Sequence, residues 1–234
     1  DALPIFIAED EKEQGIMRPY PPLGILYLSK FLKDRALDVG LFDATFSDFD
    51  TLLNEIKKKQ PKAVAIYTNL MTKLNVIRLM KAIRKEVALD QTKIILGGPD
   101  VSYNYERYLK AGADFIVIGE GEETLFELVT AIKRHESHQE IAGIAYIDEG
   151  KYIKNAARIK IKNINELPFP DREGIDLSAY LRVWKKYHGQ STISISTQRG
   201  CPYTCKWCST AVYGQSYRRR SPELVADEVE YLIQ

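Results

Sequence analysis

The sequence lacks a long apolar run and any large excess of charge. Its 234 residues contain no stretch approaching the roughly 20 consecutive apolar residues that a membrane-spanning helix requires. Lys and Arg total 33 against 32 Asp and Glu, so the overall basic character of a nucleic-acid-binding protein is absent. A hydrophobic content of 45% at a net charge of +1 also excludes general disorder. We therefore expect a globular protein with no membrane span and no nucleic-acid partner.

Cysteine is scarce and unevenly placed. The chain has three cysteines, Cys201, Cys205 and Cys208, and an odd, clustered set is a poor disulfide framework. Residues 1–8 also lack the basic start and the small-residue cleavage site of a signal peptide. We therefore expect a cytoplasmic protein whose three neighbouring thiols hold a metal or a cluster.

Apolar runs alternate with amphipathic stretches through the first 134 residues. Strands are predicted at residues 4–8, 39–42, 63–67, 93–96 and 115–118, and helices at 24–34, 51–59, 74–87, 105–111 and 122–134. Five such units with continuously apolar strands predict an α/β fold with a doubly wound, five-stranded parallel sheet, Rossmann-like and flavodoxin-like. Ligands of such sheets bind outside the carboxyl ends of the strands.

The pattern changes after residue 134. The turn Asp148-Glu149-Gly150 predicts a hairpin between 144–147 and 152–154, and the prolines of 164–172 indicate an extended linker. A short helix is predicted at 178–187 and a strand at 192–196, directly before the cysteines. Ser221 is a typical N-cap for a final helix over 222–234.

The cysteine spacing of three residues and then two restricts the kind of site. Thiolates are soft ligands for iron–sulfur clusters and for zinc. Three cysteines can bind three irons of a four-iron cluster, which leaves the fourth iron free to bind a small molecule. Structural zinc requires four protein ligands, and His188 is the alternative source of a fourth. Three free thiols without a metal are the remaining alternative.

Glycine-rich and polar loops follow four of the predicted strands, at 18–24, 68–72, 97–102 and 119–124. Glycine lets the backbone approach a bulky ligand closely, although each loop alone is also explained by ordinary turn chemistry. The dinucleotide fingerprint G-x-G-x-x-G does not follow the first strand. A response-regulator site is disfavoured as well, because the aspartate expected after the third strand is missing.

The cysteine loop, with Trp207 just before its last cysteine, resembles the cluster motif of the radical S-adenosylmethionine (SAM) superfamily. The following Arg219-Arg220-Ser221-Pro222 is similar to the sequence after that motif. The loops Pro21-Pro22-Leu23-Gly24, Gly97-Gly98-Pro99 and 119–122 resemble the cobalamin-binding domain of B12-dependent radical SAM enzymes. The resemblance covers roughly residues 3–233.

This resemblance implies three cofactors: a [4Fe–4S] cluster on Cys201, Cys205 and Cys208, SAM, and cobalamin. SAM would bind the unique iron, with Tyr203 and Trp207 beside it. An external one-electron reductant of the flavodoxin or ferredoxin type would start cleavage of SAM to a 5′-deoxyadenosyl radical. The implied reaction on a small-molecule or peptide substrate is methyl transfer to an unactivated centre. Oxidative cyclisation and a non-catalytic cobalamin- or zinc-binding module are the alternatives.

The resemblance also implies a set of cobalamin contacts in the four loops. They are Pro22, Leu23, Gly24, Thr68, Asn69, Leu70, Gly97, Gly98, Asp100, Val101, Gly119, Glu120, Gly121 and Glu122. Residues 9–24 contain no histidine, so no imidazole from this loop is expected below the cobalt.

These observations predict three parts. Residues 1–140 form the cobalamin-binding domain, 141–190 a hairpin and linker, and 191–234 the first part of a radical SAM domain. Because a radical SAM barrel has more βα units than this, we expect the chain to be part of a longer enzyme and inactive alone.

Two groups of side chains have ordinary structural explanations. His135 and His138 are expected in a solvated turn at the end of a helix. Tyr180, Trp184 and Tyr187 are expected to pack between the parts of the molecule.

Overall fold

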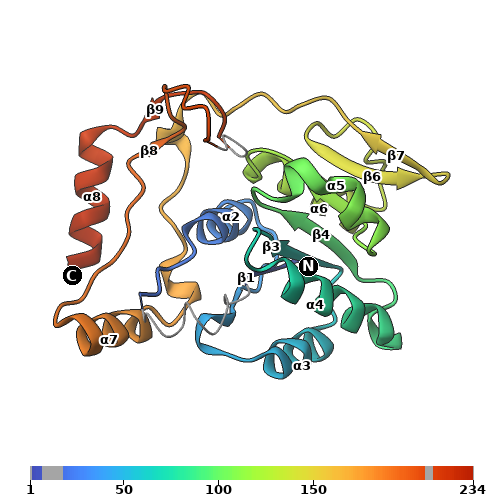
Figure 1. The fold of residues 1–234 in the computed structure, drawn as a ribbon, viewed down its shortest axis with the longest axis horizontal. Coiled ribbons are helices and arrows are strands. Elements are labelled where there is room, and N and C mark those ends of the chain that lie inside the picture. Colours follow the sequence, from blue (N-terminus) through green and yellow to red (C-terminus); the bar gives the residue numbers. More distant parts are fainter. Residues whose placement is uncertain (1, 7–17, 209–212, 234) are drawn as a thin grey trace.

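The computed structural model describes residues 2–6, 18–208 and 213–233. Its main feature is a seven-stranded sheet in the order β2-β1-β3-β4-β5-β6-β7 (Figure 1). The strands are β1 Ala2–Phe6, β2 Phe42–Asp43, β3 Ala63–Tyr67, β4 Lys93–Gly97, β5 Phe115–Val117, β6 Ile144–Asp148 and β7 Lys151–Lys154. The first five are parallel, and their order is the doubly wound, flavodoxin-like one. The predicted fold is confirmed, and the predicted hairpin continues the same sheet in antiparallel pairing.

Helices cover both faces of this sheet. They are α2 Leu23–Lys33, α3 Phe49–Lys59, α4 Lys73–Lys85, α5 Val101–Lys110 and α6 Glu122–Arg134; α7 Leu177–His188 and α8 Pro222–Ile233 follow the sheet in the chain. Alternate strand residues point to opposite faces, so Val64 and Ile66 pack with α3 and α4, while Ala65 packs with α2 and α6. No helix in the described ranges is long and apolar enough to cross a membrane.

The predicted strand at 192–196 is wrong. Residues 191–197 have no regular secondary structure, and β8 (Gln198–Arg199) begins after them, paired with β9 (Arg218–Arg219). The Ser194 carbonyl accepts a hydrogen bond from Arg172, and the Ser196 carbonyl accepts one from Arg220. Arginine side chains therefore occupy carbonyl groups that a neighbouring strand would otherwise bond.

Other differences concern element ends. Helix α5 begins at Val101 rather than at 105, and the second strand occupies 42–43 rather than 39–42. The backbone of Asn104 is non-helical, with φ −122° and ψ 21°, so a kink separates residues 101–103 from the predicted helix at 105. Residues 7 and 8 of the first predicted strand lie outside the described residues. The N-cap prediction for α8 is confirmed, because the Leu224 N–H donates to Ser221 Oγ at 3.3 Å.

Candidate cofactor site

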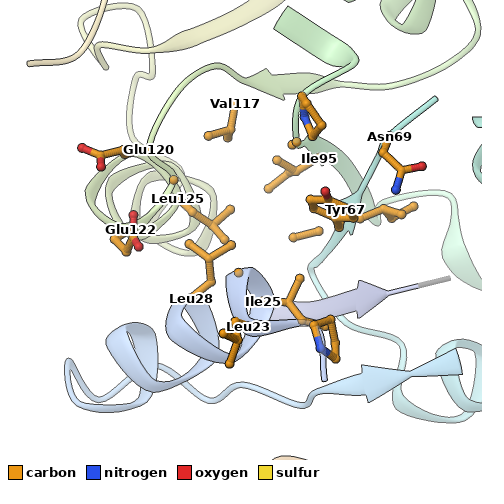
Figure 2. Close-up of a pocket in the computed structure, with 18 of the residues that line it drawn as sticks. Leu23, Ile25, Leu28, Tyr67, Asn69, Ile95, Val117, Glu120, Glu122 and Leu125 are labelled. Carbon is orange, nitrogen blue, oxygen red and sulfur yellow. The ribbon is translucent and has the colours of Figure 1, made fainter. Parts of the chain in front are cut away.

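A cavity of about 840 Å³ opens at the carboxyl ends of β3, β4 and β5, between α2 and α6 (Figure 2). The strand order reverses beside it, since β1 lies between β2 and β3. Doubly wound sheets bind their ligands at this position, and the volume is in the range of small-molecule sites. The site therefore lies where the parallel sheet predicts it.

Ten of the residues predicted to contact cobalamin line this cavity. They are Pro22, Leu23, Gly24, Asn69, Gly97, Gly98, Gly119, Glu120, Gly121 and Glu122. Four others are not on its wall: Thr68 and Val101 are buried, Leu70 is exposed, and the Asp100 carboxylate accepts a hydrogen bond from the Tyr108 hydroxyl. Their contact with cobalamin stays a prediction, as it does for all fourteen.

Gly98 lets the loops after β3 and β4 lie close together beside the cavity. Its φ of +113° is one that side-chain-bearing residues rarely adopt, and an added Cβ would lie 2.4 Å from the Thr68 carbonyl oxygen. The Thr68 N–H donates to the Gly97 carbonyl at 2.7 Å, so the two backbones stay paired beyond the ends of β3 and β4. Only glycine allows this close approach.

The apolar residues on the floor of the cavity were not predicted from the sequence to belong to a site. Ile25, Leu28, Ile95, Val117 and Leu125 line the cavity, but their periodicity marks them as core residues. These residues lie near the carboxyl ends of buried strands or at the facing ends of α2 and α6. That position alone could have indicated a role in ligand binding. Thr45, Phe46 and Tyr213 also line the cavity and carry no local signal of that role.

The cysteine loop connects β8 to β9. Cys201 is half-buried, Cys205 and Cys208 are exposed, and all three are free thiols. Among the described residues no three or more His, Cys, Asp or Glu side chains are gathered to hold a metal ion. The donor set itself fits an iron–sulfur cluster, because three soft thiolates lie on one accessible loop. Their role as ligands stays a prediction.

The two aromatic residues predicted to lie beside SAM are also on the surface of this loop. The side chain of Tyr203 is 71% exposed and that of Trp207 is 90% exposed. Both are available to a ligand, and their contact with SAM stays a prediction.

The base of the loop is tightly packed. Gly200 has a φ of +82°, and an added Cβ would lie 2.2 Å from Ser216 Oγ. Next to it, Cys201 and Gln215 form an isolated β-bridge. The residues on both sides of the cysteines are therefore held together by backbone contacts.

Buried ion pairs join this base to the wall of the cavity. Arg199 Nη2 lies 2.5 Å from Glu122 Oε1, and Arg218 Nη1 lies 2.8 Å from Glu120 Oε1. Burial acts to lower the pKa of Arg199, but the Glu122 carboxylate, assisted by Glu120, outweighs it and raises that pKa. Arg199 therefore stays charged. Residues 119–122 thus contact both the cavity and the base of the cysteine loop.

A second buried ion cluster holds α8. The Glu228 carboxylate is fully buried and accepts hydrogen bonds from Arg172 at 2.8 Å and from Arg220. These are the arginines that bond the carbonyls of Ser194 and Ser196. One carboxylate on α8 thus organises the segment that leads into the cysteine loop.

Helix α7 packs against the rim of the cavity. Trp184 Nε1 donates to the Pro19 carbonyl at 2.8 Å, and the Tyr180 hydroxyl bonds Asp43 and Thr45. Tyr180 and Trp184 are buried, which confirms their predicted packing role, whereas Tyr187 is 48% exposed. The His188 ring, the alternative zinc ligand, lies 4.8 Å from the Trp184 ring.

The histidines of the other predicted turn differ from each other. His135 is exposed, as expected, with a left-handed φ of 57° at the end of α6. His138 is half-buried instead, with its ring 4.9 Å from Phe115 and 4.6 Å from Tyr146. Burial lowers the pKa of His138, so its ring is an aromatic packing group rather than a solvated cation.

Comparison with known proteins gives a matching family model and several similar relatives. The family model described as B12 binding domain matches residues 17–129. An uncharacterized methyltransferase of Pyrococcus horikoshii is 30% identical over 91% of this chain and 46% of its own length. An anaerobic magnesium-protoporphyrin IX monomethyl ester cyclase of Cereibacter sphaeroides is 28% identical over 92% of this chain and 35% of its own length. The chain therefore spans between a third and a half of these relatives.

Solved structures show the same fold. The cobalamin-dependent SAM radical enzyme OxsB with aqua-cobalamin bound superposes with a TM-score of 0.82 at 22% identity, over 99% of this chain and 31% of OxsB. The radical SAM methyltransferase TsrM of Kitasatospora setae with cobalamin and a [4Fe–4S] cluster superposes with a TM-score of 0.74 at 21% identity, over 99% of this chain and 45% of TsrM. Residues 17–129 match the model of the B12 binding domain, and the chain has the fold of these two solved enzymes.

Proposed function

We propose that this chain binds cobalamin in the cavity at the carboxyl edge of its sheet and a [4Fe–4S] cluster on Cys201, Cys205 and Cys208, as part of a radical SAM methyltransferase. The observation that carries the proposal is the docking of the cysteine loop onto the cavity wall by Glu120 and Glu122. This contact joins the base of the cysteine loop to residues 119–122 of the cavity wall. The names of the methyltransferase relatives support the reaction class.

The cavity and the cysteine loop have different roles in this proposal. The apolar floor of the cavity excludes water from a bound corrin ring, while the glycines of the loops after β4 and β5 let backbone groups reach its polar rim. The thiols of the cysteine loop bind iron, and the exposed Trp207 ring offers a stacking surface for adenine. When bound, the reduced cluster supplies the electron that cleaves SAM to methionine and a 5′-deoxyadenosyl radical.

Anaerobic reconstitution tests this proposal. The protein, purified under argon and supplied with iron and sulfide, is expected to show iron–sulfur absorption that a C201A/C205A/C208A variant lacks. Hydroxocobalamin is expected to bind both proteins, because none of the three substituted cysteines lines the cavity. Stoichiometric zinc without iron would contradict the cluster, and no binding at high micromolar hydroxocobalamin would contradict the cavity assignment.

Oxidative cyclisation is the second candidate reaction, because a cyclase is 28% identical over 92% of this chain. The mass of the product distinguishes the two, since methyl transfer adds one carbon from SAM whereas cyclisation removes hydrogen. SAM labelled in its methyl group therefore decides between them. Label that appears in the product supports methyl transfer, and its absence from a dehydrogenated product supports cyclisation.

The remaining parts of the proposal concern the surroundings of the enzyme. We propose a small-molecule or peptide substrate, an external flavodoxin- or ferredoxin-type reductant and a cytoplasmic location. The three free thiols favour a reducing compartment. The near balance of charge, 33 basic against 32 acidic residues, disfavours a nucleic-acid substrate.

A further inference from the structure

Two arginines face each other at the base of the cysteine loop. Arg199 on β8 and Arg218 on β9 are direct partners in the register of this two-stranded ladder. Like charges placed directly opposite on neighbouring strands destabilise the pairing. The ladder has only two residues in each strand, so it has few backbone hydrogen bonds to offset that repulsion. The ladder therefore depends on groups outside itself.

The loop between β5 and α6, together with the first residue of α6, supplies the opposing charge. Glu122 pairs with Arg199 at 2.5 Å, and Glu120 pairs with Arg218 at 2.8 Å and with Arg199 at 3.4 Å. The side chains of Arg199, Glu120 and Glu122 are at most 5% exposed, so water does not screen these charges. Removing one carboxylate would leave two guanidinium groups with a single carboxylate, so one positive charge would be uncompensated in a buried site, which is a costly change.

The same loop is part of the cavity. Gly119, Glu120, Gly121 and Glu122 all line it, and so does Tyr213, which lies between the last cysteine and β9. The Arg199 guanidinium carbon is 5.2 Å from the centre of the Tyr213 ring, within the range of a cation–π contact. A ligand in the cavity would thus contact residues 119–122, which pair with the arginines at both ends of the cysteine loop, and Tyr213 within that loop.

We propose that Glu120 and Glu122 are positioning residues that couple occupation of the cavity to the order of the cysteine loop. A ligand that fixes the loop after β5 favours the docked β8–β9 ladder and brings the cysteines to one place. The coupling is reciprocal, because each site changes the affinity of the other by the same factor. The identity of the two ligands, cobalamin and an iron–sulfur cluster, rests on the proposed function.

Hydrogen exchange of the protein without cofactors tests the docking itself. In the E122Q variant the amides of residues 198–201 and 215–220 are expected to exchange at least about tenfold faster than in the wild type, since the ladder loses its neutralising charge. E123Q is the matched control, because the Glu123 side chain is 51% exposed and pairs with Arg158 instead. Equal exchange in E122Q and E123Q would overturn the proposal.

A double variant separates charge balance from misfolding. E122Q/R199Q removes both members of the closest pair, and it is expected to exchange more slowly than E122Q in the same segments. Exchange in the double variant that is as fast as in E122Q would show that the unbalanced arginine is not the cause, and it would overturn the proposal.

Iron release tests the coupling. Hydroxocobalamin is expected to slow the loss of iron from the reconstituted protein to a chelator by about 5-fold to 100-fold in the wild type and in E123Q. In an R199Q/R218Q variant, which removes the ion-pair partners of Glu120 and Glu122 and changes no residue of the cavity lining, the rates of iron release with and without hydroxocobalamin are expected to be equal. Retention of the effect in that variant would overturn the coupling alone. A wild-type protein that binds no hydroxocobalamin would overturn the proposed function and the coupling together.

Discussion

At the scale of single residues, the absence of a Cβ at Gly98 and the hydrogen-bonded carboxylate of Asp171 are both expected to affect the stability of the protein. Gly98 allows two loops to approach until only a hydrogen atom fits between them. Asp171 joins the linker to α2, because it accepts hydrogen bonds from Ser29 at 2.5 Å and from Lys33 at 2.7 Å. Neither contact is between residues that are neighbours in the sequence.

Substituting Gly98 is expected to destabilise the protein. In G98A the new Cβ meets the Thr68 carbonyl oxygen at 2.4 Å and the φ of +113° is strained, so we expect a loss of at least about 1–3 kcal/mol in the free energy of unfolding. Urea unfolding measures it. G24A is the control, since Gly24 also lines the cavity but has no atom within 4 Å of an added Cβ. Equal stability of the two variants would contradict the close approach.

Asp171 is expected to make stability depend on pH. Burial acts to raise its pKa, but the hydrogen bonds from Lys33 and Ser29 and the Lys33 charge together lower that pKa below the usual 3.8. Its contribution is therefore complete above 3.8 and is lost as the pH falls through the lower, folded-state pKa. D171N is expected to lose less stability than the wild type between about pH 6 and about pH 3, by up to about 1 kcal/mol. Parallel pH profiles of the unfolding midpoint would contradict this.

At the scale of elements, helix α7 closes the rim of the cavity from a distant part of the chain. Its Tyr180 and Trp184 bond the segments 43–45 and 18–20, and both segments include residues of the cavity wall. The Tyr20 ring lies 5.2 Å from the Trp184 ring. The docking of this helix therefore determines the shape of one side of the site.

Y180F is expected to weaken this docking. The pKa of Tyr180 is raised by burial and by the Asp43 carboxylate, so its hydroxyl keeps its proton and donates it to Asp43. Loss of that donor leaves a carboxylate without its partner and is expected to cost about 1–3 kcal/mol of stability. Differential scanning calorimetry measures the change, and Y187F is the control because the Tyr187 side chain is 48% exposed. A transition temperature as high as that of Y187F would contradict the docking role.

At the scale of the whole molecule, one buried ion cluster joins the sheet domain to the base of the cysteine loop, and a second holds α8 to the segment before that loop. Glu120 and Glu122 dock the base of the cysteine loop, and Glu228 ties α8 to the chain before it. Figure 1 shows α8 standing apart from the sheet, so these side chains are a main connection between the two regions. Binding of a ligand to one region is therefore expected to stabilise the folded molecule as a whole.

Hydroxocobalamin is expected to raise the stability of the protein by mass action. At a free concentration 100 times its dissociation constant, a ligand that binds only the folded state adds about 2.7 kcal/mol. Thermal unfolding at increasing hydroxocobalamin measures this, and the C201A/C205A/C208A variant is expected to shift as well because its cavity is intact. A transition temperature independent of hydroxocobalamin would contradict the cavity assignment.

Much of the sheet and of the cavity loops was predictable from local patterns. Buried parallel strands such as β3 read as unbroken apolar runs, and glycines mark the loops at their ends. The strand predicted at 192–196 is wrong because its alternating isoleucines are typical of a strand, whereas in the structure two of its carbonyls accept hydrogen bonds from arginine side chains. Glu120 and Glu122 were predicted only as cobalamin contacts, since no local pattern shows their pairing with Arg199 and Arg218, which lie 77 to 98 residues further along the chain.

The order of amino acids therefore establishes the alternation of strands and helices, the position of the ligand loops and the spacing of the three cysteines, because each depends on residues a few positions apart. The folded arrangement alone establishes the apolar cavity floor, the closure of its rim by α7 and the docking of the cysteine loop on Glu120 and Glu122. These features join distant segments, and a buried charge is stable only where folding has brought its partner within hydrogen-bonding distance.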